Sequence, residues 1–143
     1  MEETIRVVIK KPYQPAYEDN IKNDLHTFYK IINCDLIEMC SLPIDRDISM
    51  IIDDNGKMFG RAGNFIVPEF RDCILGTCIF SATDESGDNI SLTDKQVKTI
   101  NDYLKDYELH NGEDIYFHSQ ELIENAVRKM QKSEVELWLI ILT

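Results

Sequence analysis

The sequence has few of the features that usually identify chemistry. Neither close pair of cysteines, Cys34/Cys40 or Cys73/Cys78, has the two-residue spacing of a zinc knuckle or a redox motif. All four lie among apolar residues, which predicts buried, reduced thiols. The longest apolar run, 137–142, is too short to span a bilayer, and MEETIRVVIKK has no signal-peptide pattern. We therefore expect a cytoplasmic protein with no membrane partner and no cofactor.

Catalytic motifs are also missing. No GxSxG elbow accompanies the three histidines. His110 and His118 flank Glu113 and Asp114, and these four could form a metal site, but scattered histidines of this kind are more typical of an ordinary loop. Asp53 and Asp54 form a carboxylate pair, but they precede a turn, where aspartate is common for conformational reasons. We expect no metal and no catalytic residue, and the sequence favours a protein that is not an enzyme.

Basic residues are in deficit, with 15 Lys and Arg against 26 Asp and Glu, and a net charge of −11. Between residues 84 and 124, eleven acids stand against three bases. Such a field repels nucleic acid and anionic membranes and attracts basic surfaces. The alternative is a solvated acidic face that only keeps the protein soluble.

The segment DDNGKMFGRAGN, residues 53–64, follows an apolar run and contains three glycines. Asn55-Gly56 is typical of a type I′ turn, in which both central residues have positive φ. The glycine spacing matches neither a Walker loop nor GxGxxG, so the segment does not predict a nucleotide loop of either kind.

Four polar residues in and after this segment remain as candidates for a small anionic pocket: Lys57, Arg61, Asn64 and Arg71. If the glycine loop folds back on the sheet, they could bind an anionic ligand such as a nucleotide derivative. In the other interpretation, Asn64 bonds to the backbone of the loop and the arginines pair with surplus acids of the protein.

Hydrophobic periodicity predicts a single α+β domain over residues 1–143, with a mainly antiparallel sheet and two to three packed amphipathic helices. Short connections between strands in the middle of the chain favour antiparallel pairing. The expected strands are 4–9, 36–41, 48–53, 73–82, 115–118 and 135–142. The expected helices are 19–32, 94–107 and one beginning at 119. Thr93 and Gln96 predict a capping box for the second helix, and 65–70 reads as irregular.

The middle of the chain resembles an uncharacterised domain family carried by bacteriophages and mobile elements of Gram-positive gut bacteria. The resemblance covers about residues 4–104, and 105–143 looks like an extension. The matching residues are Asp54, Gly56, Lys57, Asn64, Asp72, Ile74, Gly76, Thr77, Leu92, Thr93 and Gln96. The family implies no activity, but it implies a setting in which many small acidic proteins interfere with host defence.

Two functional hypotheses result. In the first, a non-catalytic acidic protein docks on a basic host protein and does not bind nucleic acid directly; its acidic face consists of Asp94, Asp102, Asp106, Glu108, Glu113 and Asp114. In the second, the glycine loop binds a small anionic ligand. A homodimer is a weaker expectation, because VELWLIIL would be an adhesive edge strand unless it is central in the sheet or paired across a dimer.

Overall fold

The computed structural model describes residues 3–56, 61–110 and 115–142. Its strands are β1 (Thr4–Lys10), β2 (Tyr17–Lys22), β3 (Ile37–Leu42), β4 (Asp45–Asp53), β5 (Gly63–Val67), β6 (Asp72–Leu75), β7 (Cys78–Thr83) and β8 (Asn89–Ile90). Its helices are α1 (Leu25–Ile32), η1 (Pro68–Phe70, a 3₁₀ turn), α2 (Asp94–Tyr107) and α3 (Ile115–Leu142). All pairs among these strands are antiparallel, which confirms the predicted α+β class.

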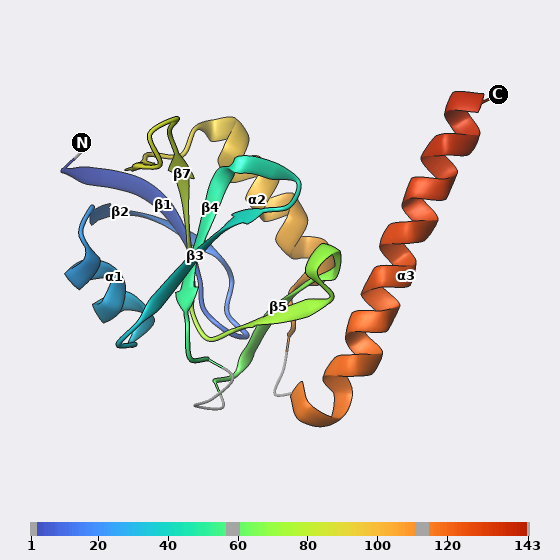
Figure 1. The fold of residues 1–143 in the computed structure, drawn as a ribbon, viewed down its shortest axis with the longest axis horizontal. Helices are drawn as coiled ribbons and strands as arrows, with labels where there is room; N and C mark the ends of the chain where they lie inside the picture. The colour runs from blue at the N-terminus through green and yellow to red at the C-terminus, as the bar shows by residue number, and fades with distance from the viewer. Residues whose placement is uncertain (1–2, 57–60, 111–114, 143) are drawn as a thin grey trace.

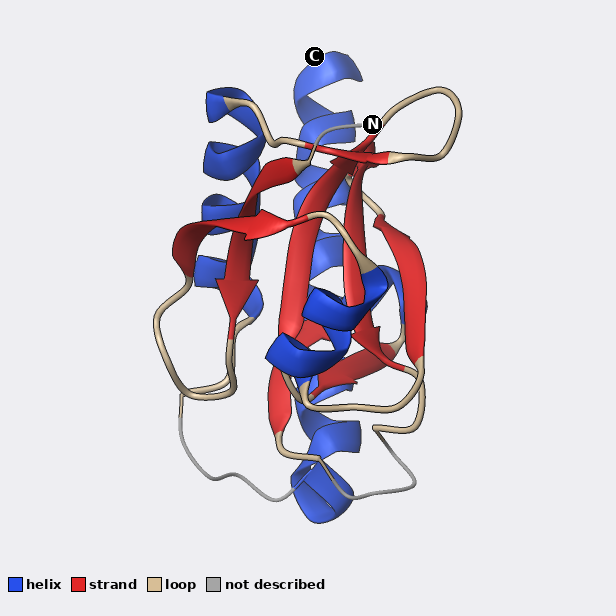
Figure 2. Cartoon of the chain, turned by 90° about the vertical axis from the view of Figure 1, so that its left-hand side faces the viewer, coloured by secondary structure: helices blue, strands red, loops and turns tan. Residues whose placement is uncertain are grey.

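The main sheet has the strand order β2–β1–β7–β4–β3, with β8 paired to the end of β7, and β5–β6 form a separate small sheet (Figure 1). Because side chains alternate along a strand, the main sheet has two apolar faces. On one face, Ile5, Val7 and Ile9 pack against Phe28 and Ile32 of α1. Figure 2 shows α1 in front of the sheet, with α3 on the far side.

The opposite face of the main sheet packs against α2 and the small sheet. Val8 and Phe80 belong to the same buried cluster as Ile100 and Leu104 of α2. Phe65 of β5 stacks on Phe80 with 5.7 Å between ring centroids. The small sheet is therefore held by its inner face on the core of the main sheet.

The outer face of the small sheet is covered by α3. Ile66, Cys73 and Leu75 point away from the main sheet and form a third buried cluster with Ile123 and Val127 of α3. Both faces of β5 are thus covered, and all five of its residues are buried. No described helix is long and apolar enough to cross a membrane.

The helix predicted at 19–32 is shorter, because residues 17–22 form β2 in a hairpin with β1. Ile21 lies at helical spacing from Leu25, but it belongs to strand β2 and its side chain is buried there. The helix begins after Asp24, whose carboxylate accepts a hydrogen bond from the Thr27 amide, and ends at Asn33 in the left-handed conformation. By contrast, the capping box of Thr93 and Gln96 on α2 is confirmed.

The segment 65–70 is not irregular, and 73–82 is not one strand. Residues 63–67 form β5, whose lack of alternation follows from burial on both faces. The apolar run 73–82 is divided at Gly76, which has φ of 78°, so that β6 joins the small sheet and β7 the main one. Gly76 therefore marks a change of sheet rather than a bulge.

The two strands predicted near the C-terminus are wrong, since 115–142 form one helix of 28 residues. In VELWLIIL, Val135 and Leu139 are four residues apart and both more than half exposed. Extending an existing helix costs little once it has been nucleated. The edge-strand reason for a homodimer is therefore lost, although self-association itself stays a prediction.

The predicted type I′ turn at Asn55-Gly56 is also wrong, because neither residue is among those with positive φ. The Asp53 side chain instead accepts a hydrogen bond from the Asn55 amide at 2.9 Å. Such a side-chain-to-backbone bond forms an Asx turn, which needs no positive φ. Position 56 is crowded, since an added Cβ would lie 3.2 Å from Leu75 Cβ and Leu75 would have to move by a few tenths of an ångström.

Candidate functional site

Arg61, one of the candidate ligand residues, is engaged within the fold. Its Nε lies 3.1 Å from Oδ2 of Asp53, a carboxylate with only 2 % of its side chain exposed. Its Nη2 donates to the carbonyl oxygen of Asn33 at 2.6 Å. The guanidinium thus links the end of β4 to the end of α1, and both Nε and Nη2 already donate to partners within the fold.

Asn64 is fully buried and joins three parts of the backbone. Its Nδ2 donates to the carbonyl oxygens of Lys10 at 2.7 Å and Gly76 at 2.8 Å. The main-chain carbonyl oxygen of Asn64 accepts a hydrogen bond from the Leu109 amide at 3.0 Å. The side chain therefore fixes the junction between the two sheets. Its buried Oδ1 has no partner among the described residues.

The remaining members of the predicted anionic pocket are not brought together. Lys57 lies outside the described residues. Arg71 is exposed after η1, whereas Arg61 lines a hollow of about 260 Å³ with Asn33, Cys34 and Asp35. Neither Asn64 nor Arg71 lines that hollow. The described part of the chain therefore offers no converging set of anion donors.

The cysteines occupy unreactive settings. All four are free. Burial raises the pKa of the Cys78 thiol well above its ordinary value, and burial also raises the pKa of Cys34 and Cys40. A raised pKa keeps the thiol protonated and poorly nucleophilic. Opposite Cys78, Lys10 is buried with its Nζ bonded to the carbonyl of Lys11, and burial lowers the Lys10 pKa.

The predicted acidic face lies on α2 and the residues after it, and its acids have nearby bases. Asp94 pairs with Arg6 at 2.7 Å, Asp102 with Lys98 at 2.5 Å, and Asp106 with Lys129 of α3 at 3.8 Å. Lys98, by its hydrogen bond, holds the pKa of Asp102 below its ordinary value. Glu108 lies 3.5 Å from His110. Glu113 and Asp114 lie outside the described residues.

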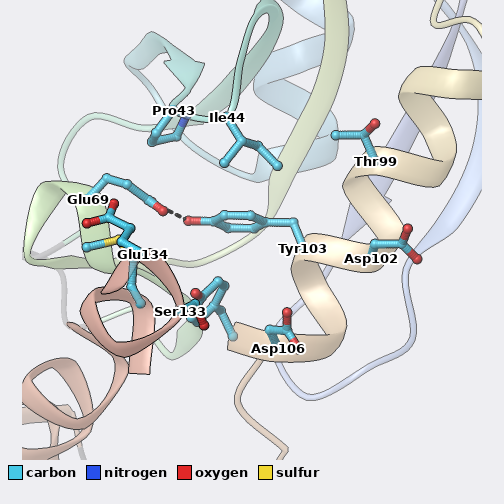
Figure 3. A pocket seen from close by; sticks show the side chains of 11 residues that line it. Pro43, Ile44, Glu69, Thr99, Asp102, Tyr103, Asp106, Ser133 and Glu134 are labelled. Carbon is cyan, nitrogen blue, oxygen red and sulfur yellow. Dashed lines mark hydrogen bonds between the residues drawn. The ribbon is translucent and has the colours of Figure 1, made fainter. Parts of the chain in front are cut away.

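A groove of about 710 Å³ opens between α2, α3, η1 and the turn that joins β3 to β4 (Figure 3). Its apolar lining includes Pro43, Ile44, Tyr107 and Met130. Tyr103 of α2 crosses it, and its hydroxyl donates to Oε2 of Glu69 at 2.9 Å. Burial and the bond to Glu69 raise the pKa of Tyr103 far above its usual value, so the phenol stays neutral.

Four carboxylates line the same groove, and they come from three elements: Glu69, Asp102, Asp106 and Glu134. The described lining contains no lysine, arginine or histidine. Within the described residues, no group of three or more His, Cys, Asp or Glu has the arrangement of a metal site. The groove therefore combines negative charge with apolar surface, which suits an organic cation.

Sequence reasoning found Asp102 and Asp106 but missed Glu69, Tyr103, Glu134 and Ile44. Tyr103 follows Ile100 at helical spacing and could have been added to the buried stripe of α2. Glu134 directly precedes the strand predicted at 135–142, so the sequence did not place it on a helix face. Glu69 had no signal, because its position depends on a 3₁₀ turn within a segment that looked irregular.

Residues 5–108 of the chain match the model of a family described as Domain of unknown function (DUF3846). The match begins in β1 and ends just after α2, so it leaves out α3. No curated protein and no solved structure is significantly similar to the chain.

Proposed function

Because the chain belongs to the DUF3846 family, a domain of unknown function, we propose a role from its own surface: it is a non-catalytic interaction protein whose acidic face docks on a basic partner protein. The exposed carboxylates of α2 carry this proposal. The side chains of Asp94, Asp102 and Asp106 are 95 %, 51 % and 60 % exposed. They point outward from a helix whose other face is buried in the core.

Acidic residues are in excess along α2 and the residues that flank it. Seven acids stand against three bases between residues 84 and 110, and the chain as a whole carries −11. Surface ion pairs remain accessible to a competing cation because each is worth little in water. A basic partner can therefore replace lysines such as Lys98 and be steered to the face by long-range attraction.

The resemblance to domains of phages and mobile elements suggests a setting for this docking. In that setting the partner is a basic host protein, and a nucleic-acid-binding protein of host defence has the required charge. Carboxylates one helical turn apart, as in Asp102 and Asp106, present a row of negative charge to such a surface. The chain would then block its partner without chemistry.

The other hypothesis, a small anionic ligand held by the glycine loop, has less support. Arg61 donates to Asp53 and Asn33, and Asn64 donates to Lys10 and Gly76. An incoming anion would have to displace these bonds. The acidic groove adjoining α2 would add further repulsion.

The proposal is tested by replacing Asp102, Asp106 and Glu108 with lysine. Partners are captured from a host lysate at low and high salt and identified by mass spectrometry, and the captured protein is then purified. We expect its association rate constant with the triple variant to fall by about tenfold or more at low salt, since steering contributes at least that much to such rates. The salt dependence of the rate should weaken in parallel.

A matched control changes the net charge equally at other sites, by replacing Asp19, Glu38 and Glu85 with lysine; all three lie on exposed strand or turn positions. If the association rate constant falls by the same factor in both triple variants, only net charge matters and the docking face is refuted. The anionic-ligand hypothesis would replace this one on a different result: the triple variant of the face keeps its full biological effect, while Arg61→Ala, verified as folded, abolishes that effect.

A further inference from the structure

The groove between α2 and α3 holds like charges on facing walls. Asp102 and Asp106 come from α2, Glu69 from η1, and Glu134 from α3. Carboxylates that face one another across a partly enclosed space repel, and the repulsion is relieved when a cation lies between them. The arrangement therefore favours a positively charged occupant.

Two of these carboxylates have no ion-pair partner among residues 3–56, 61–110 and 115–142. Lys98 reaches Asp102 along the surface of α2, and Lys129 approaches Asp106 only to 3.8 Å. Among the described residues, no ion pair includes Glu69 or Glu134. Within the described part of the chain, the hydrogen bond that Glu69 accepts comes from the neutral hydroxyl of Tyr103.

Glu134 is exposed, yet it continues the face of α3 that packs on the small sheet. Ile123 and Val127 are the buried contacts of α3, and Met130 follows them along the same face into the groove. The next residue of this face, four positions beyond Met130, is Glu134. The helix thus turns a carboxylate toward the body of the protein at the point where it stops packing against it.

The apolar lining decides what kind of cation fits. A bare metal ion would gain nothing from Ile44, Tyr107 or Met130, and a groove of about 710 Å³ is much larger than one ion needs. An arginine side chain has an apolar stem and a flat, charged fork that pairs with carboxylates in two-pronged fashion and stacks on aromatic rings. Tyr107 is partly exposed and provides the aromatic surface, and it lies against the buried Tyr103 with 4.9 Å between ring centroids.

We infer that this groove receives an arginine side chain from a basic segment of the partner protein, with Glu69 and Glu134 binding the guanidinium and Ile44 contacting the stem. This inference rests on the proposed function and names the chemistry of the partner. The groove is one binding site on the acidic face. Replacing Glu69 or Glu134 with a neutral residue leaves most of the charge of that face unchanged.

The test uses the full chain and a fluorescein-labelled peptide of alternating arginine and serine, with anisotropy as the readout at low salt. Glu134→Gln and Glu69→Gln should each weaken binding by about five- to tenfold, because each removes a charge-assisted partner of the guanidinium. Glutamine at 69 still accepts the Tyr103 hydroxyl bond. Ile44→Ser, which changes no charge, should weaken it by about threefold through lost contact with the stem. A lysine peptide of equal charge should bind more weakly than the arginine peptide.

The matched control is Glu85→Gln, an equal loss of charge in the exposed turn between β7 and β8, which should change the affinity by less than about twofold. Equal losses for all three Glu→Gln variants, with none for Ile44→Ser, would mean diffuse attraction; the groove would then be refuted while the acidic-face proposal stands. Displacement of the peptide by spermidine at equal concentration would show a small-cation site and overturn the inference. Absence of peptide binding by the wild type would also overturn it, and lysate capture would still decide the proposed function.

Discussion

Arg61 and Asp53 form an ion pair in which the carboxylate is almost completely buried and the guanidinium is about one-third exposed, with Nε 3.1 Å from Oδ2. The pair joins a residue near the end of the segment 53–64 to the end of β4. Removing the arginine would leave a buried charge with only the Asn55 amide as a described donor. A residue that looked like a ligand contact in the sequence is therefore a structural tie.

Arg61→Ala should lower the free energy of unfolding by about 2 kcal/mol, discounted for the partial exposure of the guanidinium. Urea denaturation followed by circular dichroism measures this change. Arg71→Ala serves as the control, because Arg71 is exposed, and we expect a change within about 0.5 kcal/mol. Equal stability of Arg61→Ala and the wild type would contradict the structural role.

Gly56→Ala should cost about 1 kcal/mol or more, through crowding rather than through positive φ. The new methyl would lie 3.2 Å from Leu75 Cβ and 3.3 Å from the Leu75 carbonyl oxygen. The companion change Leu75→Ala leaves a Cβ in place, so it should not rescue the loss. Gly87→Ala is a contrasting control. Gly87 has φ of 84° and open space around it, so an added methyl there would cause backbone strain without crowding. A melting temperature of Gly56→Ala equal to that of the wild type would refute the close approach.

Lys10→Met should raise or preserve stability at neutral pH and remove part of its pH dependence. Burial lowers the pKa of Lys10 below its ordinary value of 10.5, so the unfolded chain binds a proton there more readily than the folded one. Protonation of Lys10 therefore destabilises the folded state at pH values below its folded pKa. This destabilisation disappears as the pH rises from the folded pKa toward 10.5. Denaturation midpoints between neutral pH and pH 10.5 should rise for the wild type relative to Lys10→Met. Parallel curves would contradict the lowered pKa.

Val127→Asp should loosen α3 from the small sheet, whereas Val135→Asp on the same helix should have little effect. Val127 is 3 % exposed in the cluster with Ile66 and Leu75, and Val135 is 57 % exposed. Burying an unpaired carboxylate should cost about 3 kcal/mol or release the helix. Hydrogen exchange of α3 amides distinguishes the two variants. Equal protection in both would mean that α3 does not pack as described.

Local signals predicted some elements well and others poorly. The capping box at Thr93 and the stripe of Val97, Ile100 and Leu104 are sequence-local, and α2 was found with its bounds. Strand β5 was missed because a strand buried on both faces shows no alternation. The helix predicted from 119 was found as part of α3, but its continuation over 135–142 was missed because a short apolar run such as VELWLIIL fits a buried strand as well as a helix.

The candidate site shows the same division. The acids of α2 could be assigned to an exposed face, since helical spacing alone places them opposite the apolar stripe. The groove could not be predicted, because it depends on the packing of α3 against β5 and β6 and on the position of Glu69. The individual roles of Arg61 and Asn64 depend on partners far away in sequence, such as Asn33 and Lys10.

The position of α3 also has a consequence for comparing family members. The family match ends at residue 108, whereas the helix that covers Ile66, Cys73 and Leu75 begins at 115. A relative without such a helix would expose these three positions to water, and selection for solubility would favour polar residues there. The residues at these three positions therefore become an evolutionary marker, from which the presence or absence of a covering helix in a relative can be inferred before its structure is known.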